Sequence, residues 1–127
     1  MDTPEFWKAF GLCIASVNDG EATLEMDVPD WAMSPFGAVH GGAISMFFDT
    51  ALAVAIVSRL SGPADRVATH HLSVSYASFT GERRLIARTR VVSLTRTVAI
   101  ADGEVCDASG KLIAKAVGTF GVRRRES

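Results

Sequence analysis

One carboxylate, Asp49, lies within a run of otherwise uncharged residues that extends from position 40 to position 58. Such a run predicts a helix that is apolar on nearly all of its faces, and helices of that kind are normally buried. Burying an ionised carboxylate without partners costs several kcal/mol or more. Asp49 therefore needs either a structural partner, such as the hydroxyl of Thr50 or of another residue, or a chemical role.

The length and composition predict one soluble globular domain over residues 1–127. Of the 127 residues, 48% are hydrophobic and 21% are charged, which is ordinary for a folded soluble protein. The formal net charge of -1 provides no general attraction to nucleic acid or to an anionic membrane. We therefore expect no nucleic-acid partner and no membrane partner.

We expect a cytoplasmic protein that needs no metal or redox cofactor. The first residues carry acidic side chains and lack the basic segment and apolar run of a secretory signal. The apolar run after Gly42 is interrupted by Ser45 and Asp49 and is marginal in length for a membrane span. Cys13 and Cys106 have no CxxC spacing and do not group with the three histidines, which argues against a disulfide framework or a zinc site.

The first half of the chain predicts a hairpin followed by one long helix. Residues 4–10 favour a short helix with Thr3 as its N-cap and Pro4 at its first helical position. The elements expected next, from alternation, turn residues and helix stops, are a strand over 12–17, a turn at 18–20, a strand over 22–28, a loop over 29–39 and a helix over 40–60.

The second half predicts only strands, arranged as an antiparallel meander. The expected strands cover residues 66–78, 84–94, 96–106 and 112–122. A helix that is apolar all round cannot lie on a flat sheet with half its surface in water, so the sheet must curl around it or a partner must cover the rest. The predicted fold class is α+β.

Two glycines at the start of the long helix suggest a place for chemistry. Gly41 and Gly42 open the helix, where backbone N–H groups lack intrahelical acceptors and where glycine lets a ligand approach closely. A thioester or ester carbonyl there would have its developing oxyanion stabilised by N–H donors. Asp49 would then act as the general base for a water molecule or as the nucleophile itself.

Helix geometry constrains how these groups work together. Gly41 and Asp49 are eight residues apart, which corresponds to about 12 Å along a helix axis. One helix therefore cannot bring both groups to one carbonyl. If they act together, the carboxylate that faces Gly41 comes from a second copy of the chain, with the two helices antiparallel across a two-fold axis.

These residues resemble a known family, the hotdog-fold acyl-CoA thioesterases, in the branch similar to phenylacetyl-CoA and 4-hydroxybenzoyl-CoA thioesterases. The signature of that branch is His40-Gly41-Gly42 with an acid nine residues after the histidine. The order of further matches extends over nearly the whole chain: Val67-Ala68-Thr69, Val74-Ser75-Tyr76, Gly81-Glu82, Thr95-Arg96-Thr97, Gly110-Lys111-Leu112 and Gly118-Thr119-Phe120.

The resemblance implies a curled antiparallel sheet around one central helix, assembled as a homodimer and commonly as a homotetramer, a dimer of dimers. It implies that the Gly41 N–H polarises the thioester carbonyl, that Asp49 of the facing subunit activates water or attacks, and that His40 helps to orient the substrate. Thr69 matches a position where relatives hold a hydroxyl close to the acid.

Other positions are implied to bind substrate. Thr95, Arg96 and Thr97 match a segment that contacts the pantetheine and phosphate part of coenzyme A. Ser34 stands six residues before the histidine, where many relatives have a longer Asn or Gln near the thioester.

Two functions remain open on the sequence. The first is hydrolysis of an acyl-CoA, with an aromatic or a short-chain or medium-chain acyl group, to the free acid and coenzyme A; coenzyme A is then part of the substrate. The alternative is a non-catalytic hotdog module that binds acyl-CoA. A buried carboxylate at Asp49 favours the enzyme, since pure binding has little use for it. His40 also has a purely structural interpretation as a helix cap.

Overall fold

In the computed structural model, which describes residues 3–124, six strands form one antiparallel sheet in the order β1-β2-β4-β5-β6-β3. The strands are β1 (Leu12–Asn18), β2 (Glu21–Asp27), β3 (Arg66–Tyr76), β4 (Arg84–Leu94), β5 (Val98–Asp107) and β6 (Leu112–Arg123). The two edges of the sheet are therefore β1 and β3. The helical elements are α1 (Glu5–Ala9), the short 3-10 helix η1 (Asp30–Ala32) and α2 (Gly41–Val57).

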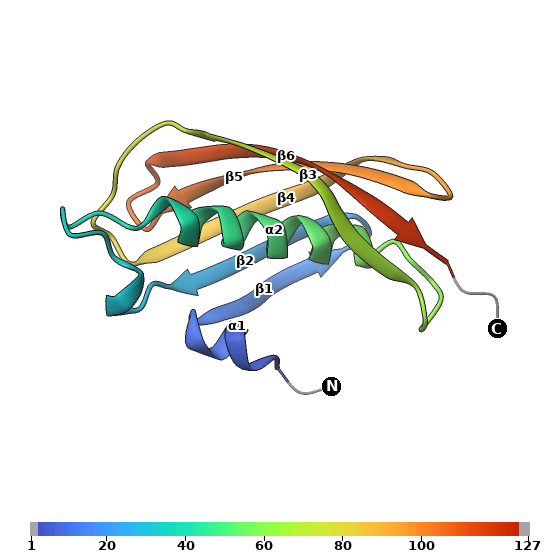
Figure 1. Cartoon of the computed structure of the whole chain (residues 1–127), viewed down its shortest axis with the longest axis horizontal. Coiled ribbons are helices and arrows are strands. Elements are labelled where there is room, and N and C mark those ends of the chain that lie inside the picture. Colours follow the sequence, from blue (N-terminus) through green and yellow to red (C-terminus); the bar gives the residue numbers. More distant parts are fainter. Residues whose placement is uncertain (1–2, 125–127) are drawn as a thin grey trace.

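The long helix α2 lies lengthwise on one face of the sheet, and β3 crosses its C-terminal part (Figure 1). Alanines on the sheet, among them Ala87, Ala99 and Ala101, are fully buried and let the helix approach closely. The buried face of α2 consists of Ala43, Ile44, Phe47, Phe48, Ala51, Leu52, Ala55 and Ile56. This architecture confirms the predicted α+β hotdog fold.

The position of β3 corrects the prediction of a simple meander. β3 pairs with β6 along its length, and β4 pairs with β2 and β5. The cause is the connection over residues 77–83, which is longer than a tight hairpin loop. Its first N–H groups, those of Ala77 and Ser78, donate to the carbonyl of Ile113 in β6, and the Thr80 carbonyl then accepts from Val39 before α2. The connection thus carries the chain from one sheet edge past the start of the helix.

The helix ends differ slightly from the predicted ones. α2 begins at Gly41, with His40 as its N-cap, and ends at Val57. The predicted cap of the first helix is wrong. Pro4 occupies the N-cap position of α1, which has no side-chain cap hydrogen bond, so Thr3 does not cap it.

The predicted turn between β1 and β2 is confirmed and is tied to the helix. Asp19 and Gly20 both have positive φ, 44° and 91°, as a two-residue hairpin turn of the primed type requires. The Gly20 N–H donates to Ser58 Oγ at 2.7 Å. This bond fixes the C-terminal end of α2 against the β1–β2 hairpin.

One face of α2 stays open between the two sheet edges. Its partly or fully exposed residues include Asp49, Thr50, Ala53, Val54 and Val57. The sheet therefore encloses only part of the helix. The apolar sequence of α2 led us to expect that the sheet would curl around it or that a partner would cover the rest, and that Asp49 would be buried. In the single chain Asp49 is only partly buried. Within residues 3–124, no helix has the length and apolar character that crossing a membrane requires.

Candidate active site

His40 caps the N-terminus of α2. Its backbone is extended (φ -63°, ψ 134°), and its Nδ1 accepts a hydrogen bond from the Gly42 N–H at 2.9 Å. A neutral imidazole that accepts at Nδ1 carries its proton on Nε2. The capping interpretation of His40 is thus correct. Within residues 3–124 the Nε2–H of this exposed residue has no acceptor, so it is available to donate to a ligand.

The Gly41 N–H is the open donor at this helix end. Within residues 3–124 it has no hydrogen-bond acceptor, as expected for a first-turn N–H. A cavity of about 520 Å³ lies against it. The residues that line this cavity, here called the helix-start cavity, are Val39, Gly41, Gly42, Ile44, Tyr76, Ala77, Ser78, Phe79 and Thr80.

Tyr76 is a site residue that the sequence analysis included in the family match but did not predict as part of the site. Its hydroxyl donates to the Gly41 carbonyl at 2.9 Å and lies 2.5 Å from Ser45 Oγ. The available signal was alternation, because Val74 and Leu72, which lie two and four residues before Tyr76 on the same strand, pack against the core. Tyr76, the last residue of β3, thus connects this strand to the N-terminal part of α2 by hydrogen bonds.

Asp49 accepts a hydrogen bond from Thr69 Oγ1 to its Oδ1 at 2.5 Å. The hydroxyl of Thr50, the other candidate partner, instead donates to the sulfur of Met46 at 3.7 Å. Within residues 3–124 no cation forms an ion pair with Asp49. One neutral hydroxyl leaves most of the carboxylate lone pairs available to a water molecule or a substrate.

An irregularity in β3 accompanies this contact. The pairing register between β3 and β6 shifts between Thr69 and His71, which is a β-bulge or a similar irregularity. Bulges redirect side chains and are common next to active sites. Thr69 faces Phe120, whose side chain is buried under α2, so the strand presents the threonine hydroxyl to the helix.

Ser34 uses its side chain within its own loop. Its Oγ accepts from the N–H groups of Phe36 at 3.2 Å and of Ala38 at 3.4 Å. It is not part of the wall of the helix-start cavity. Its predicted contact with substrate stays a prediction.

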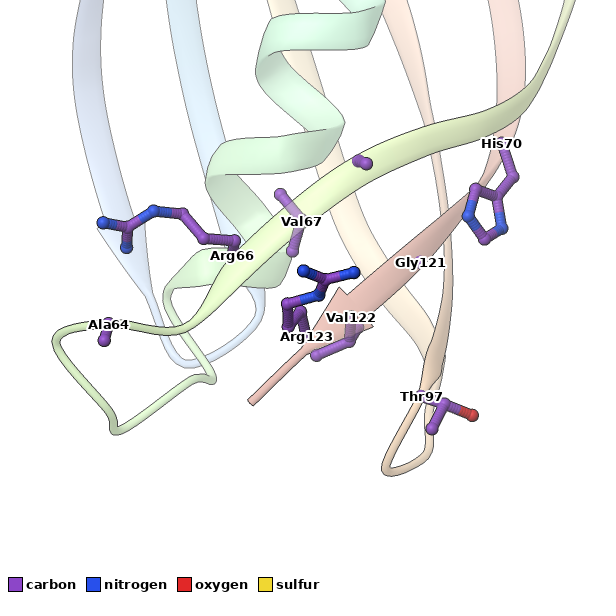
Figure 2. A pocket seen from close by; sticks show the side chains of 9 residues that line it. Ala64, Arg66, Val67, His70, Thr97, Gly121, Val122 and Arg123 are labelled. Atoms are coloured by element: carbon purple, nitrogen blue, oxygen red, sulfur yellow. The ribbon is translucent and has the colours of Figure 1, made fainter. Parts of the chain in front are cut away.

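Of the predicted coenzyme A segment, Thr97 lines a cavity, whereas Thr95 organises the turn. Thr95 Oγ1 donates to the Val98 carbonyl at 3.0 Å, and the carbonyls of Thr95 and Arg96 accept from the Arg124 guanidinium at 3.2 Å each. Thr97 lies at the hairpin tip between β4 and β5, beside a cavity of about 510 Å³ (Figure 2).

This second cavity, here called the arginine cavity, has a basic wall. Arg66 at the start of β3 and Arg123 at the end of β6 are direct cross-strand partners. His70 lies on the same wall, with its ring over Gly121, where an added Cβ would come within 2.4 Å of Nε2 (Figure 2). The Arg66 guanidinium donates to the carbonyls of Pro63 at 3.3 Å and Asp65 at 3.0 Å. The two arginines give this wall a positive charge, which would attract an anion.

A buried carboxylate supports the helix-start cavity from behind. Asp107 is 2% exposed and accepts from Thr80 Oγ1 at 2.9 Å and from Ser109 Oγ at 2.5 Å. The Ser109 hydroxyl above all, with Thr80 and the N–H groups of Lys111 and Ser109, holds the pKa of Asp107 below its ordinary value, against the opposing effect of burial. Thr80 is thereby fixed to the turn between β5 and β6.

One chain does not bring all of its candidate residues together. Gly41 and Gly42 line the helix-start cavity, while Asp49 lines a separate groove further along α2. Within residues 3–124, no group of three or more His, Cys, Asp or Glu residues is arranged to hold a metal ion.

Solved structures of similar fold include several thioesterases. A variant of the phenylacetic acid degradation protein PaaI from Thermus thermophilus is 30% identical, with a TM-score of 0.82, and the match covers 93% of this chain and 98% of that one. A thioesterase from Haemophilus influenzae is 19% identical (TM-score 0.86; 94% and 82% covered). A hypothetical thioesterase protein from Streptococcus pneumoniae, solved with coenzyme A, is 21% identical (TM-score 0.83; 94% and 92% covered).

The family comparison covers the helix and most of the sheet. Among curated proteins no significant match was found. A sequence profile of the thioesterase superfamily matches residues 36–114, a stretch that contains Gly41, Asp49 and Thr69. Since this match extends over more than half of the chain, the chain belongs to the thioesterase superfamily and is a thioester hydrolase.

Proposed function

We propose that this protein hydrolyses an acyl-CoA to the free acid and coenzyme A, with the Gly41 N–H polarising the thioester carbonyl and Asp49 of a second subunit acting on it. The observation that carries the proposal is the pairing of an open N–H at a helix start with a carboxylate held by one neutral hydroxyl. An N–H group that donates to the oxyanion of a transition state typically raises the rate by about a hundredfold to a thousandfold.

The chemistry is written as a hydrolysis. As a base, Asp49 takes a proton from water while the water oxygen bonds to the carbonyl carbon. The Gly41 N–H donates a hydrogen bond to the oxyanion that forms. The carbon–sulfur bond then breaks, and the coenzyme A thiolate leaves and is protonated. As a nucleophile, Asp49 would itself bond to the carbon and form an anhydride that water opens. Hydrolysis in ¹⁸O-labelled water under single-turnover conditions distinguishes these routes, because only the second places ¹⁸O in the Asp49 side chain.

His40 and Thr69 have supporting roles in this proposal. His40 donates Nε2–H toward the acyl group while its Nδ1 keeps the helix capped. Thr69 fixes one carboxylate oxygen of Asp49 and helps to position the water. Gly42 and Ser34 complete the proposed substrate contacts.

A homodimer is proposed because one chain separates Gly41 from Asp49. Strand β3 is a long edge strand of 11 residues. Unpaired edges of that length favour pairing with another chain. Two copies joined at this edge, with antiparallel helices, would bring Gly41 of each chain toward Asp49 of the other. A homotetramer would be a dimer of such dimers.

The arginine cavity is proposed to receive the phosphate groups of coenzyme A. Arg66 and Arg123 supply positive charge, and Thr97 supplies a hydroxyl at the hairpin tip. Arg96 and Thr95 belong to the same segment. The neighbour from Streptococcus pneumoniae that contains coenzyme A supports this class of ligand. We propose no metal or redox cofactor, a cytoplasmic location, and membership of the branch that contains phenylacetyl-CoA and 4-hydroxybenzoyl-CoA thioesterases, which the 30% identity to PaaI supports.

A thiol-release assay with aromatic, short-chain and medium-chain acyl-CoAs tests the activity. We expect hydrolysis by the wild type and a loss of about a hundredfold or more in Asp49→Asn. Binding of acyl-CoA without hydrolysis by the wild type would favour the non-catalytic module. Equal rates for wild type and Asp49→Asn would refute the role of the carboxylate.

Complementation between two inactive variants tests the shared site. Gly41→Pro removes the N–H at a position where helices accept proline, and His40 already has the extended backbone that precedes proline. Gly41→Ala is the matched control, because its Cβ would meet Tyr76 at an ordinary 3.5 Å and the N–H stays. Mixing Gly41→Pro with Asp49→Asn subunits should restore about a quarter of wild-type activity, since half of the dimers would contain one intact site. No recovery after verified subunit exchange would place both groups in one chain.

A further inference from the structure

An open groove lies along the exposed face of α2 and begins at Asp49. Its volume is about 560 Å³, within the range of small-molecule sites. The walls come from three elements: Phe6 and Trp7 of α1, Ile14 and Val17 of β1, and Ala53 and Val57 of α2. This acyl groove, as we call it below, is distinct in its lining from both the helix-start cavity and the arginine cavity.

The groove is apolar except at one end. Among the described lining residues, the polar side-chain groups besides Asp49 are the hydroxyls of Thr50 and Ser58 and the indole N–H of Trp7. The two hydroxyls donate to the Met46 sulfur and to the Ala55 carbonyl. Several wall residues stay exposed in the chain, including Val17 at 46% and Val57 at 49%. Such a surface has a carboxylate at its start and nothing beyond it that would recognise a charged or strongly polar ligand.

Helix geometry sets the length of the groove. Asp49, Ala53 and Val57 follow one another at intervals of four residues, so they form one row on the helix surface. The row from Asp49 to Val57 is about 12 Å long. Ala53, the smallest side chain of the row, leaves a depression in the middle.

We propose that the acyl groove holds a straight medium-chain acyl group, with its carbonyl carbon at Asp49 and its methyl end near Val57. This rests on the proposed function. An extended acyl chain advances a little over an ångström per methylene, so a medium chain covers the whole row, whereas a benzoyl or phenylacetyl group ends within the first turn. The aromatic rings of Phe6 and Trp7 on the opposite wall then cover the chain.

Chain-length kinetics test the position of the acyl group. In the wild type, kcat/KM should rise by about fourfold for each added methylene from butanoyl-CoA upward and level off near decanoyl-CoA. Val57→Trp should shift the preferred length to shorter chains, and Ala53→Phe should shift it further, with about a tenfold or greater loss for decanoyl-CoA. The matched control is Val92→Trp, a change at a 58% exposed site on β4 away from the groove, which should leave the chain-length profile unchanged.

A binding measurement separates this proposal from the hydrolysis itself. The sequence has two tryptophans, Trp7 in the groove and Trp31 outside it. In Trp31→Phe, Trp7 is the only tryptophan left, and its emission should change on saturation with the non-hydrolysable thioether S-decyl-CoA but not with coenzyme A. If the wild type hydrolysed no acyl-CoA, this response would still support the groove while the proposed function failed.

Three results would contradict the proposal that the acyl groove binds the acyl chain. The first is the same Trp7 emission with S-decyl-CoA as with coenzyme A. The second is a chain-length profile that favours acetyl-CoA or phenylacetyl-CoA in the wild type. The third is a Val57→Trp variant with an altered oligomeric state and an unaltered chain-length preference, which would assign this face to a contact between copies of the chain.

Discussion

Thr69 Oγ1 donates to Asp49 Oδ1 across the space between strand β3 and helix α2, at 2.5 Å. The bond joins two residues that are 20 apart in sequence, and they meet because β3 occupies the sheet edge beside β6. It orients the one carboxylate of α2 and fixes one of its two oxygens. The other oxygen stays available for chemistry.

Removing the Thr69 hydroxyl should slow hydrolysis without abolishing it. We expect Thr69→Val to lower kcat by about tenfold, because one hydrogen bond to a charged group is worth about 1.5 kcal/mol or slightly more. Thr69→Ser retains the hydroxyl and should keep most of the rate. Steady-state kinetics of both variants provide the check; a Thr69→Ser variant as slow as Thr69→Val would mean that the methyl group matters instead.

Substitution of His40 should separate capping from catalysis. His40→Asn retains a good N-cap, whereas His40→Ala removes it and should cost about 1 kcal/mol of unfolding free energy. Because Asn at this position cannot reproduce the Nε2–H donor, we expect His40→Asn to unfold like the wild type but to hydrolyse substrate more slowly. Urea unfolding and thiol release are the two measurements. Wild-type rates in His40→Asn would show that His40 serves as a cap alone.

The hydroxyl of Tyr76 should matter for kcat more than for stability. Tyr76→Phe keeps the ring against Gly41 but removes the bonds to the Gly41 carbonyl and to Ser45. We expect a loss of about 1 kcal/mol or less in unfolding free energy and a several-fold fall in kcat, since the first turn of α2 is held less firmly. Ser45→Ala removes only one of the two bonds and should have the smaller effect. The order of the two variants in kcat is the decisive comparison.

The stability of the protein should depend on pH through the carboxyl group of Asp107. Its pKa is lowered in the folded state, so the ionised form stabilises the protein above the unfolded-state pKa, near pH 4, and this contribution is lost as the pH falls through the folded-state pKa. Asp107→Asn should therefore lower Tm at neutral pH, and its difference from the wild type should shrink as the pH falls below about 4. Glu82→Gln, a change at an exposed carboxylate, is the control. A Tm difference that stayed constant down to acid pH would contradict this account.

Much of the fold follows from local patterns. The β4 bounds, the Asp19-Gly20 turn and the core of α2 agree with the sequence predictions, because alternation, turn residues and helix stops act over a few neighbouring residues. The place of β3 was not predictable in this way. The position of β3 depends on which strand pairs with its backbone N–H and C=O groups. The connection over residues 77–83 fixes this position through hydrogen bonds to the Ile113 carbonyl and from the Val39 N–H.

The candidate site residues also fall into two groups, those that local sequence predicts and those that depend on tertiary contacts. The open N–H of Gly41 and the cap of His40 are properties of a helix start, so the sequence predicts them. The contact of Thr69 with Asp49 came from a family resemblance, and nothing local implies it. Tyr76 and the internal bonds of Ser34 depend on tertiary contacts and on the conformation of one loop, which no spacing reveals.

The double attachment of Thr80 limits how the connection over residues 77–83 can vary. Surface loops normally accept inserted residues. Here the Thr80 hydroxyl donates to Asp107, and the Thr80 carbonyl accepts from the Val39 N–H. These two bonds fix the middle of the loop in place. A peptide tag or an added residue beside Thr80 would move the wall of the helix-start cavity, although the loop looks like an ordinary surface connection. Engineers who wish to label this enzyme should leave that loop at its present length.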